Sequence, residues 1–308
     1  MTVAVTLLFM GATSAMAKEC KLTQLAEMDM RENVNGWLLI DIGVEGKAAS
    51  VVIDTGATLG MISRGFADHA GLELKPVATR TGYAGSFQDW AGNYIKHLVD
   101  VEHLQIAGSD IPGTWSFMAT TDFSDAPWDD GEPVGVIGVD ILRHFDAEID
   151  IKAGKFRLFK RHFCEQNPLY WANEWLELPF RWRSIGNNLK GGMLANVVLD
   201  GKKIEATLDT GASITVLDWK LAKELYGLTP DSPGVQPLGQ LMSLRDEGRH
   251  DLHGYRFKTL EFGGVTLNNV VMGLADMGKS EMLLGMPQLK HFRMYIAFER
   301  HTIYFTPK

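Results

Sequence analysis

The sequence has 308 residues, about twice the usual length of one domain, which favours two domains or one large one. With 45% hydrophobic and 22% charged residues, the composition is that of a globular protein and excludes a disordered or fibrous chain. The formal net charge is -8 and no basic run occurs, so the electrostatic signature of a nucleic-acid-binding protein is missing. We therefore expect no nucleic acid among its partners.

The first 17 residues carry no charge and end in Ala15-Met16-Ala17, directly before Lys18. This small-x-small ending predicts a signal peptide over residues 1–17 that is cut after Ala17. A membrane anchor is the alternative, but a span needs about 20 apolar residues and polar residues interrupt this stretch. We expect an exported protein, periplasmic or secreted, with no stable membrane insertion.

The sequence contains two cysteines, Cys20 and Cys164. An even count in an exported chain permits one disulfide, which here would join the N-terminus to the centre of the chain. Two unpaired thiols are the alternative, and the count alone leaves both open.

Further along the chain, one motif occurs twice. Residues 52–58 read VIDTGAT and residues 207–213 read TLDTGAS, so that the second aspartate lies 209 - 54 = 155 residues after the first. The match extends upstream, because the turn-forming pairs Glu45-Gly46 and Asp200-Gly201 are separated by the same 155 residues. The sequence therefore indicates an internal duplication.

Each copy also has a matching downstream element. Residues 135–145 read GVIGVDILRHF and residues 282–292 read MLLGMPQLKHF, each followed by the pattern of a β-hairpin. β-Branched and aromatic runs separated by turn residues predominate elsewhere, so we expect a mainly β protein. The short helices that we expect are Arg64 to Ala70, Asp140 to His144 and Trp219 to Leu225.

Both halves resemble the retropepsin-like domains of the aspartic protease superfamily. The resemblance rests on apolar residues followed by Asp-Thr-Gly-Ala and on the later apolar-apolar-Gly element, with Gly138 and Gly285, and it covers nearly all of the mature chain. One such tripeptide is weak evidence, whereas two copies in equivalent places of a duplication are strong evidence. The pepsin branch commonly has serine after the glycine, so Ala57 and Ala212 favour the retropepsin branch.

The resemblance implies that Asp54 and Asp209 form one catalytic pair. Peptide hydrolysis without a metal or a covalent nucleophile needs a base that activates water and an acid that protonates the carbonyl oxygen. Two neighbouring carboxylates that share one proton supply both. An Asx-turn is the alternative for an isolated motif, but apolar flanks on both copies indicate buried strand ends, where an unpaired charge is costly.

The rest of the motif is expected to hold these carboxylates in place. By resemblance, Thr55 and Thr210 hydrogen-bond across to each other's backbone, while Gly56 and Gly211 let backbone amides approach the carboxylates. The resemblance also implies that the hydroxyl groups of Thr58 and Ser213 donate hydrogen bonds that help to hold the carboxylates.

A substrate-covering flap is expected between residues 79 and 97, a stretch rich in glycine and aromatic residues, with Tyr83 as the candidate that covers the substrate. These aromatics are alternatively ordinary hairpin and core residues. His250 and His253 lie near Asp251 but lack a third ligand nearby, so we expect no metal and no cofactor.

The resemblance implies a bilobal acid-protease fold, in which two retropepsin-like β-barrel lobes are related by pseudo-twofold symmetry. The expected segments are a signal peptide (1–17), an N-terminal lobe (18–165), an interlobe segment (166–180) and a C-terminal lobe (181–308). The expected activity is that of an aspartic endopeptidase acting as a monomer on a peptide or protein substrate. The alternatives are a non-catalytic peptide-binding protein on the same scaffold and pairing of lobes between two chains.

Overall fold

The structure is a computed structural model that describes residues 21–77, 95–120, 132–162, 169–185, 189–242, 249–277 and 281–307. The candidate flap residue Tyr83 and both cysteines, Cys20 and Cys164, lie outside these residues. Within the described part of the chain, no helix has the length and apolar character needed to cross a membrane.

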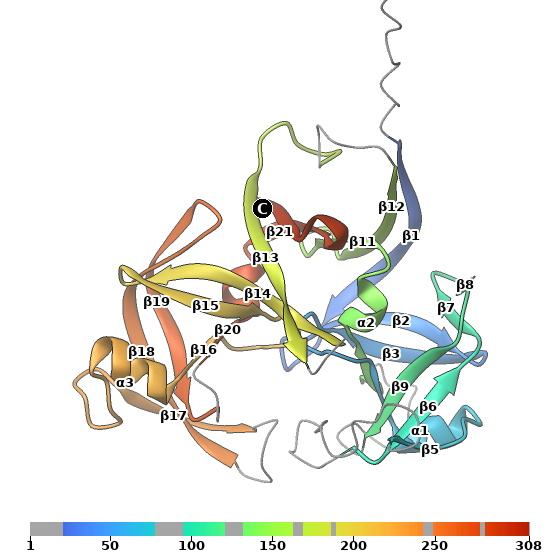
Figure 1. The fold of residues 1–308 in the computed structure, drawn as a ribbon, viewed down its shortest axis with the longest axis horizontal. Helices are drawn as coiled ribbons and strands as arrows, with labels where there is room; N and C mark the ends of the chain where they lie inside the picture. Colours follow the sequence, from blue (N-terminus) through green and yellow to red (C-terminus); the bar gives the residue numbers. More distant parts are fainter. Residues whose placement is uncertain are drawn as a thin grey trace, which may run out of the picture.

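The protein is mainly β, as the sequence predicts, and its strands form three groups (Figure 1). A central sheet contains strands from both ends and from the middle of the chain, each antiparallel to its neighbours. In spatial order these strands are β1 (Lys21–Glu32), β12 (Lys155–His162), β11 (Asp146–Asp150), β21 (Phe292–Ala297), β22 (Thr302–Pro307) and β13 (Leu176–Ile185). This sheet connects the first and second halves of the chain through the β11–β21 pair.

Two further groups of strands continue from the edges of this sheet, because β1 also pairs with β2 and β13 also pairs with β14. The group on the right of Figure 1 comprises β2 (Leu38–Val44), β3 (Lys47–Ile53), β4 (Met61–Ser63), β5 (Lys75–Pro76), β6 (His97–Val101), β7 (Leu104–Ile106), β8 (Ser109–Ile111), β9 (Trp115–Thr120) and β10 (Gly135–Ile137). The group on the left comprises β14 (Leu189–Leu199), β15 (Lys202–Leu208), β16 (Val216–Asp218), β17 (Gln236–Met242), β18 (Arg249–Phe262), β19 (Val265–Ala275) and β20 (Met282–Leu284).

The helices are short and lie close to where the sequence predicts them. They are α1 (Arg64–His69), α2 (Val139–Leu142), α3 (Trp219–Tyr226) and α4 (Met286–Leu289), with a 3-10 turn at Phe298–Arg300. The helices α1 and α3 begin after a side-chain cap, because Ser63 accepts a hydrogen bond from Phe66 N and Asp218 accepts one from Lys220 N. The three helices whose bounds the sequence predicts, α1, α2 and α3, differ from that prediction by at most two residues at either end.

The two copies of the motif make matching strand pairings. In the first, Val51 of β3 lies opposite Gly135 of β10 in a parallel pair. In the second, Ala206 of β15 lies opposite Met282 of β20, also in a parallel pair. The tight turns before these strands also match, since both residues of Glu45-Gly46 and of Asp200-Gly201 have positive φ. Positive φ at both central residues is what a two-residue hairpin requires.

A buried carboxylate in the central sheet binds groups from both halves of the chain. Glu148 of β11 is fully buried and accepts hydrogen bonds from the guanidinium groups of Arg157 (2.6 Å) and Arg293 (2.7 Å). Its second oxygen accepts a hydrogen bond from the Tyr170 hydroxyl at 2.6 Å, and the Arg293 guanidinium lies 4.1 Å from the centre of the Trp171 ring. The Glu148 carboxylate therefore links its own strand, β11, to β12, to β21 and to the segment before β13.

We predict that Glu148→Leu destabilises the protein by about 3 kcal/mol, because two mostly buried guanidinium groups lose a fully buried carboxylate and keep their ion pairs with Asp150 and, for Arg157, Glu27. The measurement is the free energy of unfolding from urea titration. Glu205→Leu is the matched control, since Glu205 forms an exposed ion pair with Arg181 and its loss should cost less than about 1 kcal/mol. Equal losses in the two variants would contradict the structural role of Glu148.

Candidate functional site

Asp54 and Asp209 occupy equivalent positions at the ends of two interior strands. Asp54 follows β3 and its backbone N–H donates to Ile137 O (3.1 Å), while Asp209 follows β15 and donates to Leu284 O (3.0 Å). Asp54 is 5% exposed and Asp209 is partly buried. Two acidic groups are thus placed at buried strand ends, where the apolar flanks of the motif predict them.

Reciprocal hydrogen bonds hold the two motif loops together. Thr55 N donates to the Thr210 hydroxyl and Thr210 N donates to the Thr55 hydroxyl, both at 3.1 Å. Each hydroxyl in turn donates to a carbonyl of the other copy, Thr55 to Leu208 O (2.9 Å) and Thr210 to Ile53 O (2.7 Å). These are the hydrogen bonds that the resemblance implies, and they bring segments 155 residues apart into one buried unit.

The glycines of the motif leave room for the acid of the opposite copy. A Cβ atom on Gly211 would lie 2.5 Å from the carboxyl carbon of Asp54, and one on Gly56 would overlap the carboxyl group of Asp209. The glycine amides bind the acid of their own loop, because Gly56 N donates to Asp54 Oδ1 (2.8 Å) and Gly211 N donates to Asp209 Oδ1 (2.9 Å). Each carboxyl group therefore lies directly over the backbone of the other loop.

The electrostatic environment favours one shared proton. Burial raises the pKa of both Asp54 and Asp209, and the charge of Asp54 raises the pKa of Asp209 further. Asp54 accepts two backbone hydrogen bonds of 2.8 Å, from Gly56 N and Ala57 N, which stabilise its charged form. Asp54 and Asp209 therefore titrate as one pair, in which a single shared proton is favoured over two neighbouring charges.

The other hydroxyl groups of the motif do not reach these carboxylates. Thr58 is partly buried and Ser213 is exposed, and within the described ranges neither hydroxyl donates to Asp54 or Asp209. The structure thus places the threonines at 55 and 210 around the pair, but not the hydroxyl groups at 58 and 213.

Sequence reasoning overlooked a third acid, partly buried, beside the first loop. Asp140, in α2, accepts a hydrogen bond from Gly60 N (3.0 Å), and burial raises its pKa to about 6. In the second copy Thr215 occupies the position of Gly60 and hydrogen-bonds Gln288 of α4 instead. The Val-Asp pair that follows Gly138 was the available signal, since it puts an acid in a short helix against the motif loop.

Other polar groupings of the described residues do not form a metal centre. No group of three histidine, cysteine, aspartate or glutamate side chains in the described ranges is arranged to hold a metal ion. Of the predicted histidine cluster, His253 packs against the Trp219 ring at 5.4 Å between ring centres.

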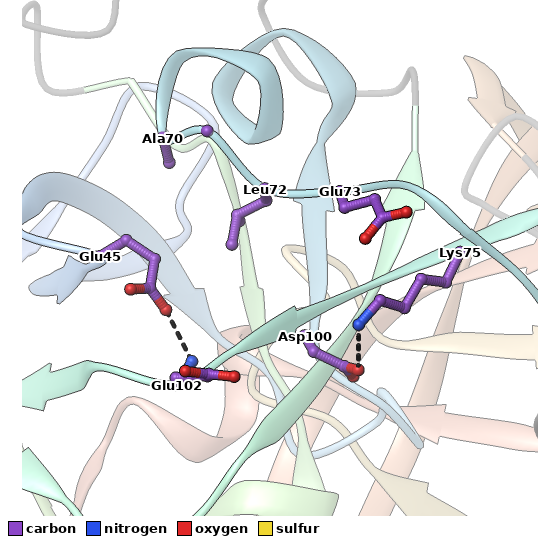
Figure 2. A pocket seen from close by; sticks show the side chains of 8 residues that line it. Glu45, Ala70, Leu72, Glu73, Lys75, Asp100 and Glu102 are labelled. Atoms are coloured by element: carbon purple, nitrogen blue, oxygen red, sulfur yellow. Dashed lines mark hydrogen bonds and ion pairs between the residues drawn. The ribbon is translucent and has the colours of Figure 1, made fainter.

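A depression rich in acidic residues lies elsewhere, and Figure 2 shows that the segment between α1 and β5, strand β6 and Glu45 of the β2–β3 turn contribute to its lining. Three of its charged side chains have partners: Glu45 accepts hydrogen bonds from the backbone N–H groups of Glu102 and His103, and Lys75 pairs with Asp100 at 3.1 Å. The residues around it include none from either motif; they are Glu45, Ala70, Gly71, Leu72, Glu73, Lys75, Asp100 and Glu102.

We predict that Gly211→Ala destabilises the protein by about 2–3 kcal/mol, because the added methyl group overlaps the Asp54 carboxyl group and the loops must separate. Unfolding in urea measures the loss. Gly254→Ala is the control, since its nearest neighbours are side-chain atoms of the exposed Leu238, which can move aside. A Gly211 variant as stable as the control would show that the two loops are not in contact.

A second prediction follows from the raised pKa of Asp209. Because the folded state holds the proton more tightly than the unfolded state, stability is fully present below about pH 4, the ordinary pKa, and falls as pH rises towards the folded pKa. Asp209→Asn removes this loss, so its stability relative to the wild type should increase as pH rises from about 4 to about 7.

Chemical unfolding at several pH values between 4 and about 7 measures this difference, which should grow with pH. The exposed Asp231 provides the control, since Asp231→Asn should leave the pH dependence of the wild type unchanged. A lower stability of Asp209→Asn at pH 7, with the wild-type slope, would reject the shared proton.

Comparison with known families gives one match. Residues 195–288 match the family described as aspartyl protease. The matched segment contains Asp209, Thr210 and Gly211 and extends through Gly285, so it includes the second motif and its downstream element. No curated protein sequence matches the chain. The family match supports a protease on this β-rich fold.

Proposed function

We propose that the protein is an aspartic endopeptidase in which Asp54 and Asp209 activate one water molecule for attack on a peptide bond. One observation carries the proposal: the reciprocal bonds of Thr55 and Thr210 place the two acids against each other at buried strand ends. Buried acids with raised pKa values in such close contact are costly unless they share a proton, and the shared proton gives the pair its chemistry.

The environments of the two acids support different roles for them in this proposal. Asp54, which accepts the two short amide hydrogen bonds, is the general base that removes a proton from water as the water oxygen attacks the carbonyl carbon. Asp209, which holds the shared proton, donates it to the carbonyl oxygen. Transfer of a proton from Asp54 to the nitrogen then accompanies cleavage of the C–N bond, and return of a proton to Asp209 regenerates the carbonyl and the resting pair.

The pairing of strands β11 and β21 favours a site built within one chain. Glu148 and Tyr295 lie opposite each other in the β11–β21 pair, and they are separated by the same 147 residues as Phe145 and Phe292 of the downstream elements. Pairing of equivalent residues is what a local twofold axis between duplicated lobes produces. We therefore propose a monomer with two pseudosymmetric lobes, exported to the periplasm or secreted, that acts on extended peptide segments.

We predict that Asp54→Asn and Asp209→Asn each lower kcat for peptide cleavage by at least about a thousandfold, since neither carboxyl group alone supplies both proton transfers. Turnover of a fluorogenic peptide library across pH, with and without a statine-type inhibitor, measures this. Wild-type activity should fall on the acid side as Asp54 is protonated and on the alkaline side as the shared proton leaves. The pair titrates as a unit, so both limits belong to the pair.

Asp231→Asn, at an exposed position outside both motifs, is the matched control and should keep wild-type turnover. Full activity in either active-site variant would reject a single shared site. Peptide binding without cleavage by the wild type would instead identify a non-catalytic peptide-binding protein. Size-exclusion chromatography of the active species distinguishes pairing within one chain from pairing between two chains.

A further inference from the structure

The walls beside the two catalytic acids differ in polarity. Side chains two residues apart on a strand point to the same side, so Val52 accompanies Asp54 and Thr207 accompanies Asp209. The parallel registers place Val136 next to Val52 and Leu283 next to Thr207. The side chains at these positions can therefore be compared between the strand pair beside Asp54 and the strand pair beside Asp209.

Beside Asp54 this face is apolar throughout. Val52 and Val136 are fully buried in a cluster with Leu39, Met61, Val77, Ile95, Leu98 and Met118. Two positions before Val136, Val134 is also buried, and its carbonyl accepts a hydrogen bond from Ser63 N. The first wall therefore provides dispersion contacts and no hydrogen-bonding side chain at these positions.

Beside Asp209 the equivalent positions carry polar groups. Glu281 takes the place of Val134, since its carbonyl accepts from Asp218 N just as Val134 accepts from Ser63 N. One Arg183 nitrogen, Nη2, donates both to Glu281 Oε2 (2.6 Å) and to the Thr207 hydroxyl (2.7 Å). An arginine–glutamate pair thus covers the position that valines occupy in the first half.

A local irregularity directs Arg183 to this position. The β13–β14 register shifts between Trp182 and Ser184, so Arg183 lies in a bulge at the end of β13, between the two halves of the chain (Figure 1). Bulges commonly redirect one side chain at functional sites. Across the bulge, Gly191 has no side chain to obstruct the arginine, and a Cβ there would lie 3.4 Å from the Arg183 Cβ atom.

Arg183 still has hydrogen-bonding capacity to offer a ligand. A guanidinium group carries five N–H donors, and the bonds to Glu281 and Thr207 both involve Nη2. Within the described part of the chain, Nε and Nη1 have no partner, and the Arg183 side chain is 28% exposed compared with 14% for Glu281. Because Glu281 neutralises the arginine, a neutral acceptor such as a side-chain amide fits better than a second carboxylate.

We propose that Arg183, held by Glu281 and Thr207, forms a polar subsite that selects a glutamine-like side chain on one side of the cleaved bond. The equivalent positions beside Asp54 offer no polar group, so the preference for glutamine should be confined to one side of the bond. This specificity rests on the proposed endopeptidase activity and adds a substrate class to it: peptides with an amide-bearing residue next to the scissile bond.

The test compares kcat/KM for peptides that differ only by glutamine or leucine, placed immediately before or immediately after the cleaved bond. At one of these two positions the wild type should prefer glutamine. The double variant Arg183→Met/Glu281→Gln, which removes both charges together, should lower the glutamine-to-leucine ratio by about tenfold at that position. The ratio at the other position should stay unchanged.

The matched control is Arg181→Met/Glu205→Gln, which removes an exposed ion pair between Arg181 of β13 and Glu205 of β15. It should retain the wild-type ratio at both positions. Thr207→Val is a milder second variant that takes one acceptor from Arg183 and keeps the side-chain shape, and it should lower the ratio in the same direction.

Two readouts separate failure of the subsite from failure of the catalytic proposal. Cleavage that depends on Asp54 and Asp209, with a glutamine-to-leucine ratio that the Arg183 variants leave unchanged, would overturn the subsite alone. Cleavage that survives Asp54→Asn would overturn the catalytic pair. Fluorescence anisotropy of the same peptides bound to Asp54→Asn measures the preference without turnover, and equal affinity for glutamine and leucine peptides at both positions would reject the subsite.

Discussion

The site depends on one closure between the two motif loops, by which we mean the reciprocal hydrogen bonds of Thr55 and Thr210. Through Thr55 and Thr210, each motif loop satisfies its buried backbone groups with atoms of the other loop, so neither loop is complete alone. This closure brings two acids together where burial opposes their ionisation. The glycines then let amides stabilise the one charge that remains. The contact between the two motif loops therefore determines both how the halves of the chain pack and how the two acids share a proton.

Much of this arrangement could be predicted from the sequence because its determinants are local. The pairs Glu45-Gly46 and Asp200-Gly201 have the residue types that a two-residue hairpin needs, and both adopt positive φ. The repeated motif marked the strand ends that carry Asp54 and Asp209, and short helices follow their capping residues. The family match to residues 195–288 agrees with the interpretation of the second copy.

The remainder could not be predicted because it depends on long-range geometry. Glu148 is a charged residue in a strand, and its sequence context gives no sign that two arginines and a tyrosine surround it. Arg183 reaches Thr207 only because of a bulge, and a bulge shifts the strand register on which an alternating pattern depends. Similarly, Asp140 accepts a hydrogen bond from a loop residue 80 positions away.

The cluster around Glu148 also bears on how the molecule would respond to a break in its chain. Its members come from β11 and β12 on one side of the connecting segment and from β21 on the other, and the carboxylate itself has no exposed surface. Separating the halves would expose ionic groups together with the apolar strands that enclose them. A protein nicked between its lobes would consequently remain a non-covalent complex, and the two fragments would dissociate only as they lose their folded structure.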